Sequence, residues 1–414
     1  MKFYIFTANC AKNFKIMGRR LLIFLMLLSI LLLGFTEYDK DNLFRYQWAL
    51  KNNGNFLIDR GILAANHNVM YFNKQVADNI FFDSADYVQY FKSYMYNPGI
   101  AYAKSSCDIK WREGYDIFSQ SPYKRDVVVA IIDTGIDITH EELANNIWVN
   151  EDEVPGNGID DDYNGYIDDV FGYNFYNRSS DVFVDPNVDI HGTHAAGTIV
   201  AKHGNGGIKG IAYDSHVKIM TLKVLGENGQ GYMSSVVEAI NYAKRNGANI
   251  CNISLGAYTY EETLDNAIKN SPEMLFIVAA GNGANYVGYS LDDKDVFPAK
   301  FNYPNVITVS NTCFDEDRYV SANYGSYVDI FAPGTLVLST VPNGTYGFFT
   351  GTSMAAPFVS ATCAMIYSAY PKVPIEQYKG LIINGATPVQ KFVGLSKSSG
   401  ILNVYNTLLF ASIF

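Results

Sequence analysis

Short apolar runs alternate with helix-forming segments from Val127 onward, and this alternation is what most restricts the folds open to the chain. Apolar runs that lack a regular polar alternation are typical of strands buried on both faces, so the pattern predicts an α/β fold: a doubly wound, mostly parallel sheet with helices on both faces. In such folds the functional side chains gather at the carboxyl ends of the strands. The expected strands include "VVVAIID", "VKIMTLKVL", "ANICNISL" and "MLFIVAAGN", and the expected helices include "HGTHAAGTIVAKHG", "MSSVVEAINYAKRNG" and "EETLDNAIKN".

Polar side chains stand at the ends of these runs, where a site is expected. Asp133 ends a strand in "VVVAIIDTGID", and Asn282 follows another in "FIVAAGN". His191 begins a helix rich in small residues, and Ser353 begins the helix of "GTSMAAPFVSATCAMIY". A serine hydroxyl is chemically idle unless a base takes its proton and nearby donors receive the charge it creates. The free N–H groups of a helix N-terminus and the amide of Asn282 are suitable donors.

Each of these residues also has a purely structural interpretation. Asp133 could cap the turn that follows it, Asn-Gly is a turn signal, and Ser353 could be an N-cap. His194, one turn inside its helix, is expected to be structural, because the HxxH spacing lacks the glutamate of HExxH and a third metal ligand. Only the combination of the four residues favours a catalytic site.

At these four positions the chain resembles the subtilisin-like serine peptidases, the subtilases. The motifs are "DTGID", "HGTH", "AAGN" and "GTSMAAP", and the resemblance covers roughly residues 125 to 390. It implies that Ser353 attacks a peptide carbonyl, that His191 accepts its proton and later gives it to the leaving amine, and that Asp133 orients the imidazole. It further implies that Asn282 and the backbone N–H of Ser353 stabilise the oxyanion.

The resemblance also assigns two stretches to the binding of an extended polypeptide substrate, although ordinary strand packing is an alternative for both. One stretch, in "NISLGA", would pair with the substrate as an added strand, and "AAG" would form the opposite wall of the primary specificity pocket. Val296 and Phe297 align only loosely with the floor of that pocket, and a mild preference for apolar side chains is expected. The residues assigned to substrate binding are Ser254, Leu255, Gly256, Ala279, Ala280 and Gly281.

An acidic stretch between Asp133 and His191, "NEDEVPGNGIDDDYNGYIDD", predicts a structural calcium site. Alternating oxygen ligands followed by Gly165 reproduce the start of an EF-hand-like loop, although the distant glutamate of that loop is absent. A solvated acidic hairpin is the alternative, because "YNGY" is also a turn signal. The candidate ligands are Asp160, Asp162, Asn164, Tyr166, Asp168 and Asp169.

The N-terminus carries the signals of export. Four basic residues between positions 12 and 20 precede an apolar run at 21–35, which predicts a signal peptide or an uncleaved membrane anchor over residues 1–36 and a secreted or surface-anchored protein. Residues 37–124 are expected to be an N-terminal extension, either a pro-region or part of the catalytic body. Its stretch 41–54 resembles the extended segment at the start of some mature catalytic domains. Residues 125–414 are expected to form the peptidase domain.

Composition and motif order argue against several other classes. A net charge of -10 without a Lys/Arg cluster disfavours nucleic acid as a partner, and five cysteines without CxxC spacing indicate neither a zinc site nor a disulfide scaffold. An α/β-hydrolase would need GxSxG and the order Ser, Asp, His. A catalytically silent peptide-binding protein on the same fold remains the alternative to a monomeric endopeptidase.

Overall fold

The computed structural model describes residues 40–52 except 42, the short stretches 57–59, 71–72, 100–102 and 104–105, and residues 107–414 except 285–286. The apolar run at 21–35 and its basic flank lie outside the described residues, as does most of the expected extension between positions 53 and 103. Within the described part of the chain, no helix is long and apolar enough to span a bilayer.

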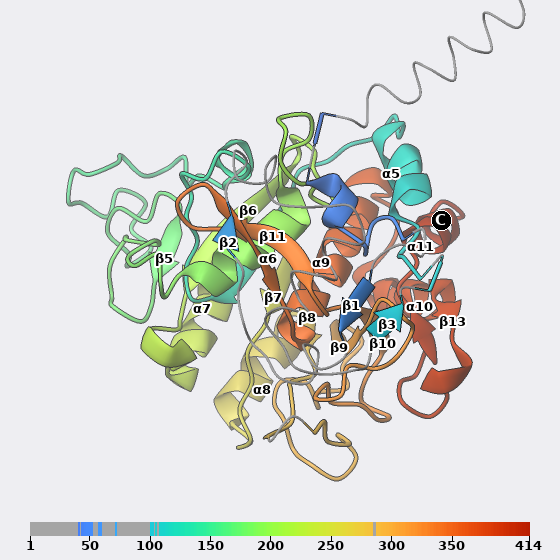
Figure 1. Ribbon diagram of the computed structural model, residues 1–414. Helices are drawn as coiled ribbons and strands as arrows, with labels where there is room; N and C mark the ends of the chain where they lie inside the picture. The colour runs from blue at the N-terminus through green and yellow to red at the C-terminus, as the bar shows by residue number, and fades with distance from the viewer. Residues whose placement is uncertain are drawn as a thin grey trace, which may run out of the picture.

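A large, mostly parallel sheet forms the centre of the molecule, and the predicted α/β fold is confirmed (Figure 1). Neighbouring strands run parallel except for one antiparallel pair at an edge, β13 and β14. Across the sheet, the nine strands found among the described residues are β13 (Thr387–Pro388), β14 (Gly400–Ile401), β10 (Ile330–Pro333), β9 (Val306–Thr312), β8 (Leu275–Ala279), β7 (Ile250–Ile253), β4 (Val127–Asp133), β6 (Val217–Lys223) and β5 (Gly172–Asn174).

Helices cover both faces of this sheet. The described α-helices are α5 (Trp111–Ser119), α6 (Ile190–Val200), α7 (Met233–Arg245), α8 (Glu262–Lys269), α9 (Thr352–Ala369), α10 (Ile375–Gly385) and α11 (Val404–Ala411). The described 3-10 helices are η1 (Phe44–Tyr46), η2 (Ala144–Asn146), η3 (Glu227–Gly229) and η5 (Gln390–Phe392). Figure 1 shows α7 and α8 on one side of the molecule and α5, α10 and α11 on the other.

The two-sided burial follows from the alternation of side chains along each strand. In β4, Val129 and Ile131 belong to the apolar cluster that contains residues of α6, α9 and α11, whereas Ala130 and Ile132 belong to the cluster that contains residues of α7 and α8. Because both faces of the strand are covered, its sequence is apolar without interruption, as the pattern predicts.

Two smaller antiparallel sheets were not expected from the sequence. One contains β11 (Val337–Val341), β12 (Thr345–Phe349) and β2 (Tyr71–Phe72), and the other pairs β1 (Leu57–Asp59) with β3 (Ile100–Tyr102). Ser339 Oγ in β11 donates a hydrogen bond of 2.7 Å to the backbone carbonyl of His194, and Thr340 Oγ1 donates one of 2.7 Å to that of Thr193. The hairpin of β11 and β12, which leads directly into α9, is thereby held against α6.

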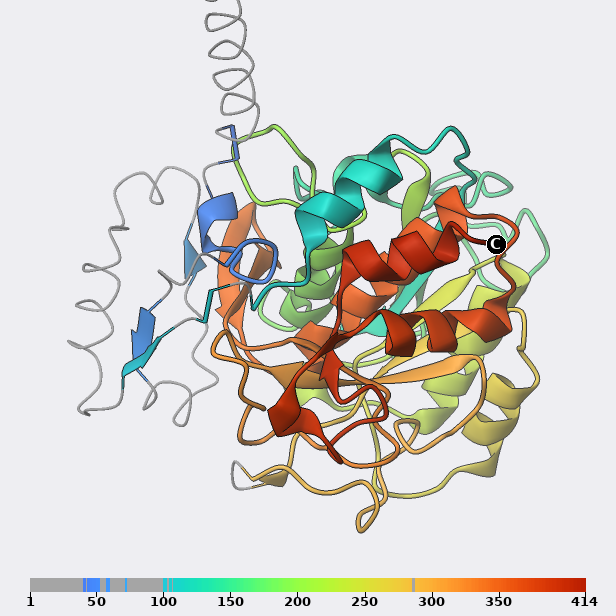
Figure 2. The ribbon, with the colours of Figure 1, turned by 90° about the vertical axis from the view of Figure 1, so that its right-hand side faces the viewer.

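Segments from opposite ends of the chain lie side by side. Figure 2 shows α5 next to α11, and the backbone N–H of Val404 at the start of α11 donates to the carbonyl of Ile109 at 2.8 Å. Earlier in the chain, the described side chains between positions 43 and 50 include Leu43 and Trp48, which are 0% and 1% exposed and belong to the largest apolar cluster. The N-terminal segment at 43–50 is therefore packed into the body of the molecule.

Candidate active site

Asp133 and His191 meet at the carboxyl edge of the sheet. Asp133 is the last residue of β4 and its side chain is 1% exposed, whereas His191 is the second residue of α6 and its side chain is 29% exposed. The imidazole Nδ1 lies 2.8 Å and 2.9 Å from the two carboxylate oxygens. The backbone N–H of Thr134 donates to Asp133 Oδ1 at 2.7 Å, which holds the carboxylate in place.

A glycine permits this close approach of α6 to the end of β4. A Cβ atom at Gly192 would lie 2.2 Å from the backbone oxygen of Gly135 and 3.4 Å from Asp133 Cβ. The Gly192 N–H donates to Thr134 Oγ1 at 3.1 Å. In the "HGT" motif, glycine at position 192 is therefore required by packing, whereas histidine at position 191 is explained by its chemistry.

The charge of Asp133 controls the proton affinity of His191. Burial alone would lower the pKa of the imidazole, but the negative charge of Asp133 and its hydrogen bond together outweigh burial and raise the pKa of His191 above its ordinary value of 6.5. Because Nδ1 faces the carboxylate, the neutral imidazole carries its hydrogen there and leaves Nε2 free to accept a proton.

Ser353 is the second residue of α9, and its backbone N–H has no partner in a preceding helical turn. Its hydroxyl donates to the backbone carbonyl of Ser254 at 3.1 Å, and Ser254 Oγ donates to the backbone carbonyl of Ser353 at 3.2 Å. Among the hydrogen bonds of the described residues, none joins Ser353 to His191. A change of the χ1 rotamer would turn the hydroxyl away from Ser254, and catalytic hydrogen bonds commonly form only once substrate is present.

Asn282 is tied to the same helix N-terminus. Its Oδ1 accepts a hydrogen bond of 3.3 Å from the backbone N–H of Thr352, while the backbone N–H of Gly281 donates to Thr352 Oγ1 at 3.1 Å. Because Oδ1 is occupied in this way, Nδ2 is the atom of Asn282 available to an oxyanion. The segment that follows β8 is thus joined to the start of α9 at Thr352, the residue before Ser353.

A series of buried side-chain hydrogen bonds leads to Ser254, and the sequence interpretation missed it. Ser360 Oγ donates to Asn252 Oδ1 at 2.8 Å, and Asn252 Nδ2 donates to Ser254 Oγ at 3.0 Å. Asn252 and Ser360 are both 0% exposed. The signal in the sequence was an asparagine inside the apolar run "ICNISL", since a buried polar group needs a partner.

The sequence interpretation also missed a buried ion pair close to the Asp133–His191 pair. Lys223, at the end of β6, is 2% exposed, and its Nζ contacts the carboxylate of Asp189 and the backbone carbonyl of Thr134. Asp189 is 0% exposed and is the residue just before α6. The buried ion pair therefore joins the residue after Asp133 to the residue two positions before His191.

His194 is buried inside the protein, and its contacts are structural. Its Nε2 is 2.9 Å from the backbone carbonyl of Val337, and its ring stacks on Phe349 with the centroids 4.5 Å apart. Burial lowers its pKa to about 3, so the ring stays neutral. This environment agrees with the structural role expected from the sequence.

A groove of about 1000 Å³ runs along the site and is lined on one side by His191 and on another by residues 254–257. Ser254, Leu255 and Gly256, which the sequence assigns to one wall of the substrate site, are among the residues that line the groove. The second expected wall follows β8 directly: Ala279 ends the strand, and Ala280 is held by a hydrogen bond of 2.9 Å from Asn323 Nδ2 to its carbonyl. Residues 279–281 are absent from the lining of this groove.

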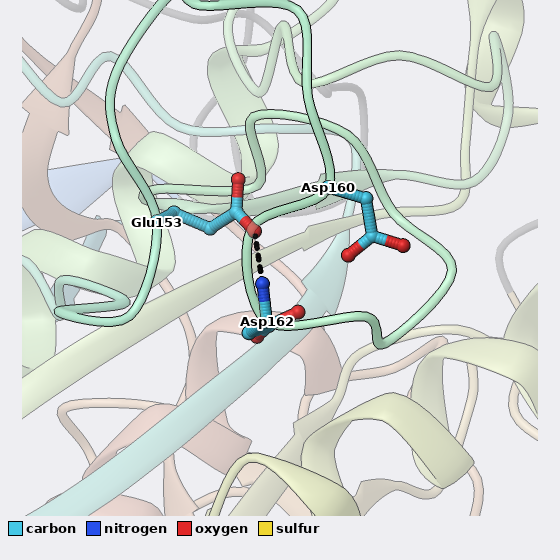
Figure 3. A group of neighbouring side chains, drawn as sticks. All are labelled: Glu153, Asp160 and Asp162. Atoms are coloured by element: carbon cyan, nitrogen blue, oxygen red, sulfur yellow. Dashed lines mark hydrogen bonds between the residues drawn. The ribbon is translucent and has the colours of Figure 1, made fainter.

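The acidic loop brings together only part of the expected ligand set. Figure 3 shows the side chains of Glu153, Asp160 and Asp162. Oxygen atoms of the three residues all lie within 4.8 Å of one another, and Glu153 was not among the expected ligands. Burial raises the pKa of Glu153, and the charges of Asp169 and Asp162 add to this effect. Glu153 Oε1 also accepts the backbone N–H of Asp162 at 3.3 Å.

Among the remaining expected ligands, Asn164 stays next to the cluster, because its Nδ2 donates to Asp162 Oδ2 at 2.8 Å, whereas Asp168 and Asp169 have other hydrogen-bond partners. The Asp168 carboxylate accepts the backbone N–H groups of Asn157 and Gly158 at 3.1 and 3.0 Å. Asp169 is fully buried and accepts hydrogen bonds from side chains, among them Asn150 and Asn164. Asn164 Oδ1 accepts the backbone N–H of Tyr166 at 2.8 Å.

Comparisons with known proteins agree with this arrangement. A family model described as the subtilase family matches residues 124–401. The chain is 35% identical over 265 residues to the major intracellular serine protease of Bacillus subtilis, an alignment that covers 63% of this chain and 74% of that protein. It is 34% identical over 276 residues to subtilisin-like protease 1 of Plasmodium vivax, covering 62% of this chain and 43% of that protein. The crystal structure of a cold adapted subtilisin-like serine proteinase superimposes with a TM-score of 0.52 at 27% identity, over 69% of this chain and 91% of that chain. The chain therefore belongs to the subtilase family, a family of serine-type endopeptidases.

Proposed function

We propose that this protein hydrolyses peptide bonds in extended polypeptides, with Ser353 as the nucleophile. The observation that carries the proposal is the pair of contacts of 2.8 and 2.9 Å between His191 Nδ1 and the Asp133 carboxylate, in a groove that also reaches Ser254, to whose carbonyl the Ser353 hydroxyl donates. A base that is oriented by a buried carboxylate can activate a serine hydroxyl that turns toward it.

In the proposed reaction, the Ser353 hydroxyl turns toward His191 Nε2, gives up its proton and attacks the substrate carbonyl. The bond from Oγ to the carbonyl carbon forms as the carbonyl π electrons move to the oxygen. His191 then returns the proton to the leaving nitrogen as the C–N bond breaks, and water repeats the sequence on the acyl-enzyme. The carboxylate of Asp133 stabilises the imidazolium in both halves of the reaction.

Asn282 Nδ2 and the Ser353 backbone N–H are proposed to bind the oxygen that becomes negative. Asn282→Ala should lower kcat by about 100- to 1,000-fold with little change in KM, because the lost hydrogen bond forms mainly in the transition state. A variant that changed only KM would assign Asn282 to substrate binding instead.

The decisive experiment is labelling by a fluorophosphonate probe, which reacts with an activated serine. We expect the folded protein to be labelled at Ser353 and to hydrolyse a peptide substrate, and we expect Ser353→Ala to remove both properties. Ser119→Ala, which alters an exposed serine at the end of α5, is the matched control and should change neither. Peptide binding without labelling would instead favour the catalytically silent peptide-binding protein.

Export and the role of the N-terminal segment are part of the proposal. We propose that the protein is secreted or surface-anchored and acts as a monomer, with residues 41–52 belonging to the mature catalytic body. The support is that Asp41 forms a buried ion pair with Lys209, and that the Gln47 side-chain amide bonds the backbone of Lys209: Oε1 accepts its N–H at 2.8 Å and Nε2 donates to its carbonyl at 2.9 Å. N-terminal sequencing of exported protein should find a start at or before Asp41, and a start beyond residue 52 would contradict this assignment.

We also propose that calcium binds the acidic loop and stabilises it without joining the chemistry. Calcium–oxygen distances of about 2.3–2.6 Å allow ligands on opposite sides of the ion to lie about 5 Å apart. The oxygens of Glu153, Asp160 and Asp162, all within 4.8 Å of one another, fit this requirement. A cation would also relieve the repulsion among these carboxylates.

Chelation tests the calcium proposal. EDTA should lower the Tm of the wild-type protein, and Glu153→Gln or Asp162→Asn should have a lowered Tm that EDTA no longer changes. Asp152→Asn, which alters an exposed carboxylate in the same loop, should keep the full response to EDTA. A wild-type melting curve that is identical with and without EDTA would refute the site.

A further inference from the structure

We infer that the Val296 side chain fills the pocket beside Ser353 and makes this protein selective for small side chains at P1, the residue on the N-terminal side of the cleaved bond. The inference rests on the proposed function. It concerns Val296 because one of its methyl groups lies between the two walls that would hold the P1 side chain.

The two walls are extensions of neighbouring strands. β7 and β8 are paired in parallel, with Ile253 opposite Val278, and beyond this pair the chain continues as residues 254–257 and as residues 279–281, of which Ala279 is the last residue of β8. Both continuations are tied to the start of α9: the first by the Ser254–Ser353 hydrogen bonds, and the second by the hydrogen bond from the Gly281 N–H to Thr352 Oγ1. The space between the walls therefore lies next to the serine hydroxyl.

Glycines face this space from both walls, and the same methyl group meets both of them. A Cβ atom at Gly256 would lie 3.2 Å from Val296 Cγ1, and a Cβ atom at Gly281 would lie 3.4 Å from it. Carbon atoms in contact are about 3.5–4.0 Å apart, so the methyl group already occupies the room that the two glycines leave. In agreement, the open groove reaches Gly256, but its lining includes neither Gly281 nor Val296.

Val296 is held firmly in this position. The neighbouring residue Phe297 exchanges two backbone hydrogen bonds with Ala257, both of 2.8 Å, which attach the segment to the first wall. The Val296 carbonyl accepts the Lys300 N–H at 2.9 Å, and the side chain is 5% exposed within the apolar cluster that contains residues of α7 and α8. A β-branched side chain has few alternative rotamers, so the methyl group cannot easily move aside for a large P1 residue.

The expected substrate class follows from this geometry. Glycine, alanine and serine place little or nothing beyond Cβ in the pocket, whereas leucine and phenylalanine would overlap the Val296 methyl group. Differences of one methylene in an apolar pocket change kcat/KM by about 10- to 200-fold. The mild preference for apolar side chains expected from the sequence is thereby narrowed to a preference by size.

The test measures kcat/KM for peptide anilides that differ only at P1. We expect the wild-type protein to favour alanine over phenylalanine by at least about tenfold. Val296→Ala and Val296→Gly should reverse or reduce this ratio by at least about tenfold, mainly through faster hydrolysis of the phenylalanine substrate. Val296→Ile should act in the opposite direction and reduce hydrolysis of the alanine substrate relative to the glycine substrate.

Val306→Ala is the matched control, because Val306 in β9 is a buried valine of the same apolar cluster that the structure does not place between the walls. It should leave the ratio of alanine to phenylalanine hydrolysis unchanged. A wild-type protein that cleaves after phenylalanine as well as after alanine would overturn the inference, and so would an unchanged ratio in Val296→Ala. In both cases Ser353 would still be labelled by the fluorophosphonate probe, whereas loss of wild-type labelling would refute the proposed function and the inference together.

Discussion

At the scale of single residues, the charge of Asp133 sets the pH at which His191 changes protonation. The imidazole must be neutral to accept the serine proton, so kcat/KM should fall as pH decreases through the pKa of His191, which lies above 6.5. Asp133→Asn removes the charge that raises this pKa, so the acid limb of the profile should move to lower pH while kcat falls by about 10,000-fold. Measured pH profiles of both proteins check this prediction, and identical midpoints would contradict it.

The interaction between His191 and Asp133 also makes the stability of the fold depend on pH. Because the pKa of His191 is raised in the folded protein, its interaction with Asp133 stabilises the fold fully only below the unfolded pKa of about 6.5. This contribution is lost as pH rises through the folded-state pKa. The pH range in which the protein is active is therefore the range in which this one contribution to stability is weakest.

Lys223 gives a second prediction at this scale. Lys223→Met should destabilise the protein by about 3–5 kcal/mol, because it leaves the Asp189 carboxylate buried without its cation. The double variant Lys223→Met with Asp189→Asn should recover part of this loss, since replacing both partners removes the unpaired charge. Urea unfolding measures the difference, and equal stabilities of the single and double variants would argue against the ion pair as the cause.

Lys244→Met is the matched control for this pair. Its partner is Glu273, and the two side chains are 39% and 54% exposed. Exposed ion pairs contribute about 0–1 kcal/mol, so this variant should unfold at nearly the wild-type urea concentration.

At the scale of elements, the contact between α6 and β11 holds the helix that carries His191 against the hairpin. A Cβ atom at Gly197 would lie 2.1 Å from Thr340 Oγ1 and 2.6 Å from Ser339 Oγ. These hydroxyls donate to backbone carbonyls of α6, so the absence of a side chain at Gly197 lets the hairpin come within hydrogen-bond distance of the helix.

A pair of identical substitutions separates this packing effect from helix propensity. Gly197→Ala should destabilise the protein by about 1–3 kcal/mol through overpacking, although alanine is the better helix former. Gly380→Ala in α10, where nothing lies within 4 Å of the new methyl group, should stabilise it by about 0.5–1 kcal/mol. Denaturant unfolding of both variants gives the two signs, and a stabilising Gly197→Ala would show that α6 and β11 are less closely packed.

At the scale of the whole molecule, the N-terminal segment is joined to parts of the chain hundreds of residues away. Trp48 Nε1 donates to the backbone carbonyl of Thr335 at 2.9 Å, and the indole meets Phe314 edge to face with the centroids 5.9 Å apart. Through these contacts a segment that precedes the first strand of the large sheet becomes part of its core.

Trp48→Ala tests this connection. Loss of a fully buried indole should lower the free energy of unfolding by about 3–5 kcal/mol and make the N-terminal segment more susceptible to added protease. Tyr123→Ala, which removes a side chain that is 68% exposed, should change the free energy by less than about 0.5 kcal/mol. If both variants unfolded at the same denaturant concentration, the segment would not be an integral part of the fold.

Much of the candidate site could be predicted because it depends on local order along the chain. Asp133 and Asn282 follow apolar runs, and the carboxyl ends of parallel strands lie at one edge whatever the order of the strands. The helices that begin near His191 and Ser353 could be located from their runs of small and apolar residues, although both are buried on all sides and lack an amphipathic period. Lys223 could not be found in this way, because its partners Asp189 and Thr134 are distant in sequence. Glu153 and Asn252 lie inside the quoted stretches, but neither follows the residue spacing from which the sites were predicted.

The sequence by itself determined the α/β fold and the two-sided burial of the sheet, and it placed Asp133 at the end of a strand, because these features depend on local order along the chain. Only the tertiary structure decided which groups meet: that Lys223 lies close to the Asp133–His191 pair, that Glu153 joins Asp160 and Asp162, and that Val296 stands between Gly256 and Gly281. The physical reason is that contacts between strand ends and loops depend on the order of strands in the sheet and on the packing of side chains. Neither can be derived from the spacing of residues along the chain.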